Sequence, residues 1–157
     1  MFKNAILDKT RKYRYVLSRQ WGANNKNLVN FVLLNPSTAD ENKDDQTIRR
    51  CINLTKSWGY DGFYVTNLFA FRTRHLKILL SSADPIGEEN DKYIREIAKK
   101  SKIVVIAWGT HGNFLHRDEV VLKLITSIKA PYYLEKTKYG HPKHPLTIKR
   151  TAKPIKI

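Results

Sequence analysis

Apolar residues gather along the chain in four short, mainly apolar runs, which cover residues 28–34, 63–69, 103–107 and 132–134. Runs of this length between turn-forming residues are typical of strands that are buried on both faces of a parallel sheet. Residues 13–20 instead alternate in the manner of a strand with two different faces, and they predict an added strand at the N-terminal edge.

The segments between these runs have the spacing of amphipathic helices. Asp44 or Asp45 can cap a helix whose apolar face lies within residues 48–55. A second helix is predicted to start at Asp84-Pro85, and a third is predicted over residues 118–128. This order of elements predicts an α/β fold, namely a three-layer α/β/α sandwich with a central, mostly parallel sheet of four strands.

The chain has 157 residues, and we expect a single domain over residues 1–150 with a basic tail at 151–157. Cys51 is the only cysteine and cannot form an internal disulfide. No apolar run reaches transmembrane length, and the first ten residues lack the apolar core of a signal peptide. We therefore expect a cytoplasmic monomer, without membrane contact or cofactor. No metal is expected either, because the histidine and cysteine spacing matches no metal site.

Positive charge is concentrated at the two ends of the chain. There are 29 Lys and Arg against 14 Asp and Glu, a net charge of +15, of which residues 1–26 hold +6 and residues 136–157 hold +7. If the ends lie side by side, they would form one basic face for a nucleic acid, DNA before RNA. A solubility role is the alternative. The candidate contacts to the phosphate backbone are Arg14, Arg19, Arg50, Lys138, Lys143 and Lys149.

Groups of unusual residues lie at or just after the carboxyl ends of the predicted core strands, where parallel sheets bind ligands. In chain order they are Asn35-Pro36-Ser37, then Asn67 with Arg72, then Trp108-Gly109, and finally His141-Pro142-Lys143-His144-Pro145. Each group also has a structural interpretation, since Asn before Pro often ends a strand and Trp is often a core residue.

This four-part layout resembles the uracil-DNA glycosylase superfamily, whose members have Asp or Asn before Pro after the first core strand, an Asn on the second and a His-Pro loop after the last. The chain also resembles a bacterial and phage family known only as a domain of unknown function. That second resemblance covers roughly residues 13–148 and rests on Leu34–Asp40, Asp45–Arg50, Asn67–Arg72, Ala107–Gly109 and Thr137–Leu146. The first resemblance implies the glycosylase fold and cleavage of an N-glycosidic bond.

Such a reaction needs a group that positions water, a reader of the base edge and a donor to the anionic oxygen of the leaving base. We expect Asn35 to hold the water, Asn67 to read the base and His144 to donate, with His141 as the second choice for the donor. Asp45 is a further catalytic candidate, although its position also predicts a helix cap. Other contacts to the substrate are expected from Pro36, Ser37, Phe69, Arg72, Trp108 and Gly109.

Two other functions stay open at this point. The chain could bind nucleic acid on the same fold without catalysis. It could also be an enzyme for a free nucleotide or nucleotide-sugar, in which the distinctive residues would be Asp40, Asp44, Asp45, Thr47 and Arg50.

Overall fold

The computed structural model covers residues 1–157 and contains one mixed sheet of seven strands and four α-helices. In chain order the elements are β1 (Phe2–Leu7), β2 (Arg14–Gln20), β3 (Leu28–Leu33), α1 (Gln46–Ser57), β4 (Gly62–Asn67), α2 (Leu76–Ser81), α3 (Asn90–Lys100), β5 (Ile103–Ile106), the 3-10 segment η1 (Thr110–His116), α4 (Arg117–Thr126), β6 (Tyr132–Tyr133), the 3-10 turn η2 (Pro145–Thr147) and β7 (Ile155–Lys156). None of the helices combines the length and the hydrophobicity that crossing a membrane requires.

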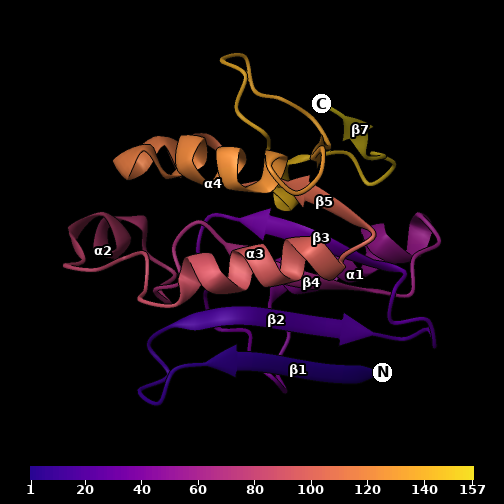
Figure 1. Ribbon diagram of the computed structural model, residues 1–157, viewed down its shortest axis with the longest axis horizontal. Helices are drawn as coiled ribbons and strands as arrows, with labels where there is room; N and C mark the ends of the chain where they lie inside the picture. The colour runs from indigo at the N-terminus through magenta and orange to yellow at the C-terminus, as the bar shows by residue number, and fades with distance from the viewer.

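The strands lie in the order β1-β2-β4-β3-β5-β6-β7 (Figure 1). β3 pairs in parallel with both β4 and β5, and β5 pairs in parallel with β6. β1, β2 and β7 run antiparallel to their neighbours. The predicted α/β class is therefore confirmed, but the sheet is mixed and has seven strands instead of four with one added edge strand.

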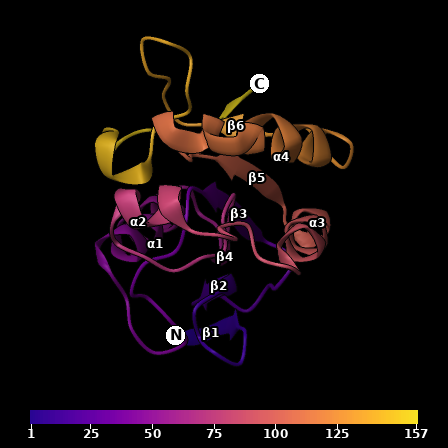
Figure 2. The same cartoon turned by 90° about the vertical axis from the view of Figure 1, so that its left-hand side faces the viewer.

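Helices lie on both faces of the sheet because side chains alternate along each central strand. Phe31 and Leu33 of β3 belong to a core cluster with Ile48 and Cys51 of α1. Val32, between them, belongs to the cluster on the opposite face, which includes buried residues of α3 and α4. Figure 2 shows α1 and α3 on opposite sides of the strands.

The predicted helices are present, but one of them starts later than expected. Asp45 is the N-cap of α1, and its Oδ1 accepts a hydrogen bond of 2.9 Å from the backbone N–H of Ile48. Asp84 does not start α3. Its Oδ1 accepts from the N–H of Gly87, whose φ of 91° is incompatible with a helix, and α3 begins only at Asn90.

The two basic ends of the chain do not lie side by side. β1 and β7 form opposite edges of the sheet, and the termini are at the bottom and top of Figure 1. The expectation of one basic face made by residues 1–26 and 136–157 is therefore wrong. The C-terminal segment is not a free tail either, because Ile155 and Lys156 pair with Tyr133 and Tyr132 of β6.

The connections leave the central strands on different sides. The chain after β3 leads into α1 on one face, whereas the chain after β5 leads through η1 to α4 on the other face. Neighbouring parallel strands whose connections diverge in this way leave a crevice at their carboxyl ends, which is where open α/β sheets bind ligands. The fold therefore predicts a ligand site between the carboxyl ends of β3 and β5.

Candidate functional site

A cleft of about 470 Å³ lies at this point of divergence. Leu34 and Asn35 line it from the end of β3, and residues 108–111 line it from the end of β5. The loop after β6 supplies the remaining wall, from Thr137, Lys143, His144 and Thr147. Asn35 and His144, which are 109 positions apart, therefore share one cavity.

The side-chain amide of Asn35 is held in one orientation. Its Nδ2 donates to three backbone carbonyls, at 2.9 Å to Thr73, 3.1 Å to Pro36 and 3.4 Å to Phe71. Three carbonyl oxygens around one end of the amide require that end to be the nitrogen. The acceptor Oδ1 is left for a partner in the cleft, such as water.

His144 is held in one tautomer. Its Nδ1 accepts a hydrogen bond of 3.2 Å from the N–H of Leu146 at the start of η2. Burial lowers the pKa of His144 to about 4, and the carboxylate of Asp45 offsets only part of that effect. The ring is therefore neutral near pH 7, and its proton lies on Nε2. The residue is a neutral N–H donor on the wall of the cleft.

Asp45 is not among the residues that line the cleft. One of its carboxylate oxygens is used in capping α1. Its charge acts on His144 and on Arg14, and at both it offsets part of the lowering of the pKa by burial. Asp45 thus caps α1, as the sequence predicted, and its negative charge also acts on the ring of His144.

Trp108 and Gly109 form the part of the wall that follows β5. The Trp108 side chain is only 3% exposed, so its ring belongs largely to the core. Gly109 has a φ of 78°, which favours glycine, and its N–H donates to the carbonyl of Pro142 at 2.8 Å. A Cβ at Gly109 would lie 4.0 Å from the Cβ of His144. Gly109 thus links the end of β5 to the loop that contains His144.

Asn67 and Phe69 do not reach the cleft, which corrects the roles expected for them. Asn67 is 1% exposed, and its Oδ1 accepts from Arg14 at 3.4 Å. Its strand, β4, is separated from β5 by β3, so it cannot border the crevice between β3 and β5. Phe69 is fully buried and packs against Phe114. Neither side chain lines the cleft.

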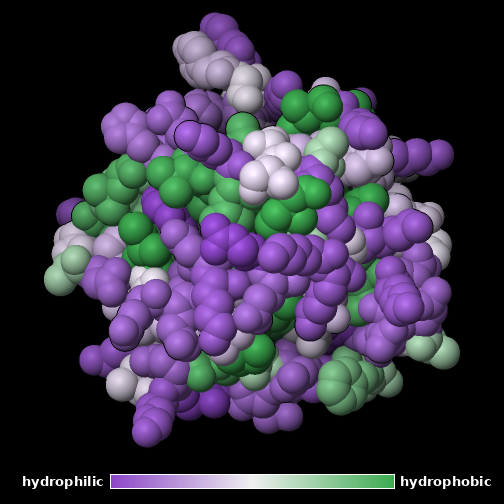
Figure 3. Space-filling view, in the orientation of Figure 1, coloured by the Kyte–Doolittle hydropathy of each residue, from purple (hydrophilic) through white to green (hydrophobic).

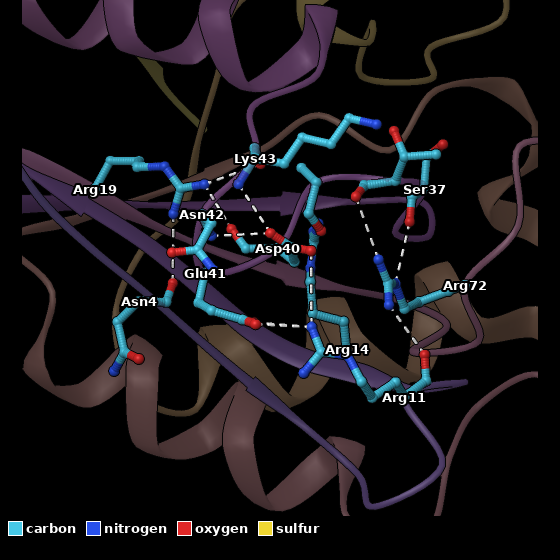
Figure 4. A network of polar contacts seen from close by, with 12 residues as sticks. Asn4, Arg11, Arg14, Arg19, Ser37, Asp40, Glu41, Asn42, Lys43 and Arg72 are labelled. Carbon is cyan, nitrogen blue, oxygen red and sulfur yellow. Dashed lines mark hydrogen bonds and ion pairs between the residues drawn. The ribbon is translucent and has the colours of Figure 1, made fainter.

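Four arginines hold the loop that joins β3 to α1 (Figure 4). Arg11 pairs with Glu41 at 2.8 Å, and Arg14 donates to the carbonyl of Ala39 at 3.1 Å. Arg19 pairs with Asp44 at 2.8 Å and also donates to the backbone carbonyls of Ser18, Asp40 and Lys43. The fourth arginine is Arg72.

The sequence suggested that Arg14 and Arg19 contact a phosphate backbone, but both side chains are buried and turned to the protein. Their exposed fractions are 2% and 0%, and their guanidinium groups are directed at protein carbonyls and at Asp44. Burial lowers the pKa of Arg14 to about 10, which still leaves it charged near neutral pH. Both side chains fix the loop that begins with Asn35.

Arg72, Ser37 and Pro36 also belong to the support of this loop. Arg72 donates to the carbonyls of Ser37 at 3.1 Å and Thr38 at 3.3 Å. Pro36 is buried, and its carbonyl accepts from Thr73 and from Asn35. None of the three lines the cleft, so they position Asn35 without bordering the cavity.

The loop after β6 projects from the body of the fold as a short basic hairpin, residues 136–142. A bridge joins Lys136 to Pro142, and Thr137 and His141 hydrogen-bond to each other. The hairpin is the projection at the top of Figure 1, and in Figure 3 the same projection is mainly purple, the colour of hydrophilic residues. Tyr139 near its tip is 80% exposed, beside the exposed Lys138.

The remaining candidates divide between the cleft and its surroundings. Lys143 lines the cleft and pairs with Glu135 at 3.7 Å. Lys149 is exposed on the same C-terminal segment, and Arg50 donates inward to the carbonyls of Pro145 and Ile148. His141 is half-buried and does not line the cleft, so only one histidine of the His-Pro pair does.

Sequence reasoning missed four polar residues of the cleft, which are Thr110, His111, Thr137 and Thr147. The first two directly follow Gly109, and their place after a buried strand was the available signal. No group of three or more His, Cys, Asp or Glu side chains is placed to hold a metal ion.

Comparison with known proteins identifies one family. The family described as "Protein of unknown function (DUF1643)" matches residues 14–146. No curated protein and no solved structure matches the chain. The match spans every residue of the cleft except Thr147.

Proposed function

The chain belongs to the DUF1643 family of unknown function, and from that premise we propose that it hydrolyses the N-glycosidic bond of a nucleotide in nucleic acid, DNA before RNA. The observation that carries the proposal is one cleft that has an oriented amide acceptor on one wall and a neutral imidazole donor on another. The two residues are Asn35 and His144.

Hydrolysis of this bond produces negative charge on the departing base and positive character on the sugar. Water then attacks the sugar carbon and forms the new C–O bond, and the proton that it loses is taken up by the departed base anion. The Oδ1 of Asn35 can accept a hydrogen bond from that water and place it, because its Nδ2 is already engaged with backbone carbonyls. The Nε2–H of His144 can donate to an oxygen of the base as charge develops there. One donor of this kind typically contributes about 10²–10³ in rate.

The resemblance to the uracil-DNA glycosylase superfamily is consistent with these two roles. It rests on four parts, which are Asn35-Pro36-Ser37, Asn67 with Arg72, Trp108-Gly109 and the loop His141–Pro145. The base reader expected on the second strand does not border the cleft, so the identity of the base depends on other side chains. Thr110, His111, Thr137 and Thr147 are the further polar groups that could read its edge.

Nucleic acid is the proposed partner because the loop after β6, which forms one wall of the cleft, is rich in basic residues. Lys143 lies on its wall, and the projecting hairpin adds Lys136 and Lys138. Tyr139 on the hairpin presents a ring to solvent, as expected of a side chain that stacks on an unpaired base. A binding constant that does not change between low and moderate salt would contradict this partner.

The test uses oligonucleotides that contain uracil, hydroxymethyluracil, hypoxanthine or only normal bases, followed by alkali to cleave abasic sites. On any oligonucleotide that is cleaved, we expect Asn35→Ala to slow the single-turnover step by about 10²–10³ and to leave affinity nearly unchanged. His144→Asn retains an acceptor near Nδ1 but loses the Nε2–H donor, and we expect a similar loss of rate.

The matched control is His141→Asn, in the same loop but outside the cleft, which should have a much smaller effect. If His141→Asn is worse than His144→Asn, the donor is wrongly assigned. If the wild type cleaves none of the oligonucleotides but binds them in a salt-dependent way, the alternative of a binding protein without catalysis replaces the proposal.

A further inference from the structure

A second hollow, of about 270 Å³, lies on the exposed side of α1. Its polar lining consists of Gln46, Arg49, Arg50 and Asn53 of α1 and Arg150 of the C-terminal segment. The four helix residues have the spacing i, i+3, i+4 and i+7, which places them on one face of the helix. No Asp or Glu lines the hollow, so it carries three positive charges without a compensating carboxylate.

Two of the three arginines are already fixed by the protein. Arg50 donates from Nη1 to the carbonyls of Pro145 and Ile148, at 3.2 Å and 3.3 Å. Arg49 donates from Nη1 to the carbonyl of Asp44 at 3.2 Å. Each therefore keeps other N–H groups for a ligand, and part of the entropy cost of ordering these side chains has been met in folding.

We infer that this hollow binds a phosphate group. Guanidinium groups bind phosphate through paired N–H donors, and the amides of Gln46 and Asn53 supply further donors of the same kind. The phosphate can come from the backbone of a nucleic-acid strand or from a small phosphate compound, and the chemistry of binding is the same for both. The backbone assignment rests on the function proposed above.

The hollow is adjacent to the cleft. The turn η2 contributes Leu146 to the hollow, while Thr147 of the same turn and its N-cap His144 line the cleft. Arg50 holds the carbonyl of Pro145, the first residue of this turn, and that of Ile148, which follows it. A strand with one nucleotide in the cleft would thus place a phosphate group in the hollow on the other side of η2. Phosphate bound there would also support the turn that positions His144.

The experiment compares Arg49→Gln/Arg150→Gln with the control Arg74→Gln/Arg95→Gln. Both double variants remove two positive charges, and the control residues are exposed arginines that do not line the hollow. Each protein is titrated with pyrophosphate by calorimetry and with a single-stranded oligonucleotide at several salt concentrations. Arg150→Gln alone is included, because Arg49 also contacts the protein backbone.

We expect the hollow variant to bind pyrophosphate at least about tenfold more weakly than the control does, with Arg150→Gln in between. For the oligonucleotide, the slope of log affinity against log salt should fall by about 0.7, the contribution of one phosphate. If the hollow variant loses affinity for the oligonucleotide and the control does not, the ligand is a backbone phosphate. If the hollow variant loses affinity for pyrophosphate alone, the ligand is a small phosphate compound. Equal behaviour of the two double variants with both ligands would overturn the inference.

These titrations do not depend on base release. A protein that binds phosphate in the hollow but releases no base would contradict the proposed hydrolysis and would leave the phosphate site standing. Conversely, base release with equal binding by both double variants would contradict the phosphate site alone.

Discussion

Protonation of His144 should destabilise the folded protein as the pH falls. Burial holds the pKa of this residue at about 4, below its ordinary value of 6.5. The unfolded chain therefore takes up the proton first, and the folded state loses stability progressively from pH 6.5 down to about pH 4. Above pH 6.5 the ring is neutral in both the folded and the unfolded state, so His144 there makes its full contribution to the unfolding free energy.

The size of the effect follows from the two pKa values. Between pH 7 and pH 5 it amounts to about 2 kcal/mol of unfolding free energy, and the full difference reaches about 3 kcal/mol below pH 4. Carboxylates with lowered pKa values, such as those of Asp40 and Glu135, also lose stabilising interactions as the pH falls. The contribution of His144 must therefore be measured as a difference between two proteins.

The comparison is between the wild type and His144→Asn, which keeps an acceptor for the N–H of Leu146 but has no titrating group. Urea denaturation at a series of pH values gives the unfolding free energy of both. We expect the wild type to lose about 2 kcal/mol more than the variant between pH 7 and pH 5. Parallel curves for the two proteins would refute both the low pKa and the neutral donor derived from it.

Three further predictions concern other parts of the molecule. Arg19→Met should lower the unfolding free energy by about 3–5 kcal/mol, because it leaves Asp44 and several carbonyls without their partner. The control is Arg95→Met on the exposed side of α3, which should change the unfolding free energy by less than about 0.5 kcal/mol. Urea denaturation measures both changes, and a loss below about 1 kcal/mol for Arg19→Met would show that the contacts of Arg19 with Asp44 and the loop carbonyls are not needed for stability. Cys51 should react with a thiol reagent only as fast as the protein unfolds, since burial raises the pKa of its thiol; rapid labelling of the native protein would contradict this. Tyr139→Ala should weaken binding of single-stranded DNA by about 1–3 kcal/mol without changing stability, whereas Tyr139→Phe should bind normally, and wild-type affinity of the alanine variant would exclude stacking.

The central strands and α1 could be predicted from the sequence because their patterns are local. The run at residues 103–107 is entirely apolar, the run at 28–34 is apolar except for Asn30, and Asp45 directly precedes the helix that carries an apolar stripe. β1 was missed because it is an edge strand whose side chains are mostly exposed, so no apolar periodicity marks it. β7 has only two residues, and its pairing with β6 depends on the path of the whole C-terminal segment.

A residue of the candidate site could be predicted only where its position relative to the preceding strand is enough to place it in the cleft. Asn35 and His144 follow core strands and do line one cleft. Asn67 is the last residue of a core strand, but the order of strands places β3 between it and the crevice, and that order cannot be derived from the local pattern. Arg14 and Arg19 resemble surface residues in sequence, and their burial depends on carbonyls of a loop more than twenty positions away.

The most direct test of the account is the mass of a single-stranded oligonucleotide after incubation with the protein. Hydrolysis of an N-glycosidic bond predicts an intact strand that has lost one base and gained one water, together with the free base in equal amount. The product should appear with the wild type and be strongly reduced with Asn35→Ala. A strand of unchanged mass for every base tested, or a product cut in its phosphate backbone with all bases retained, would contradict the proposed hydrolysis.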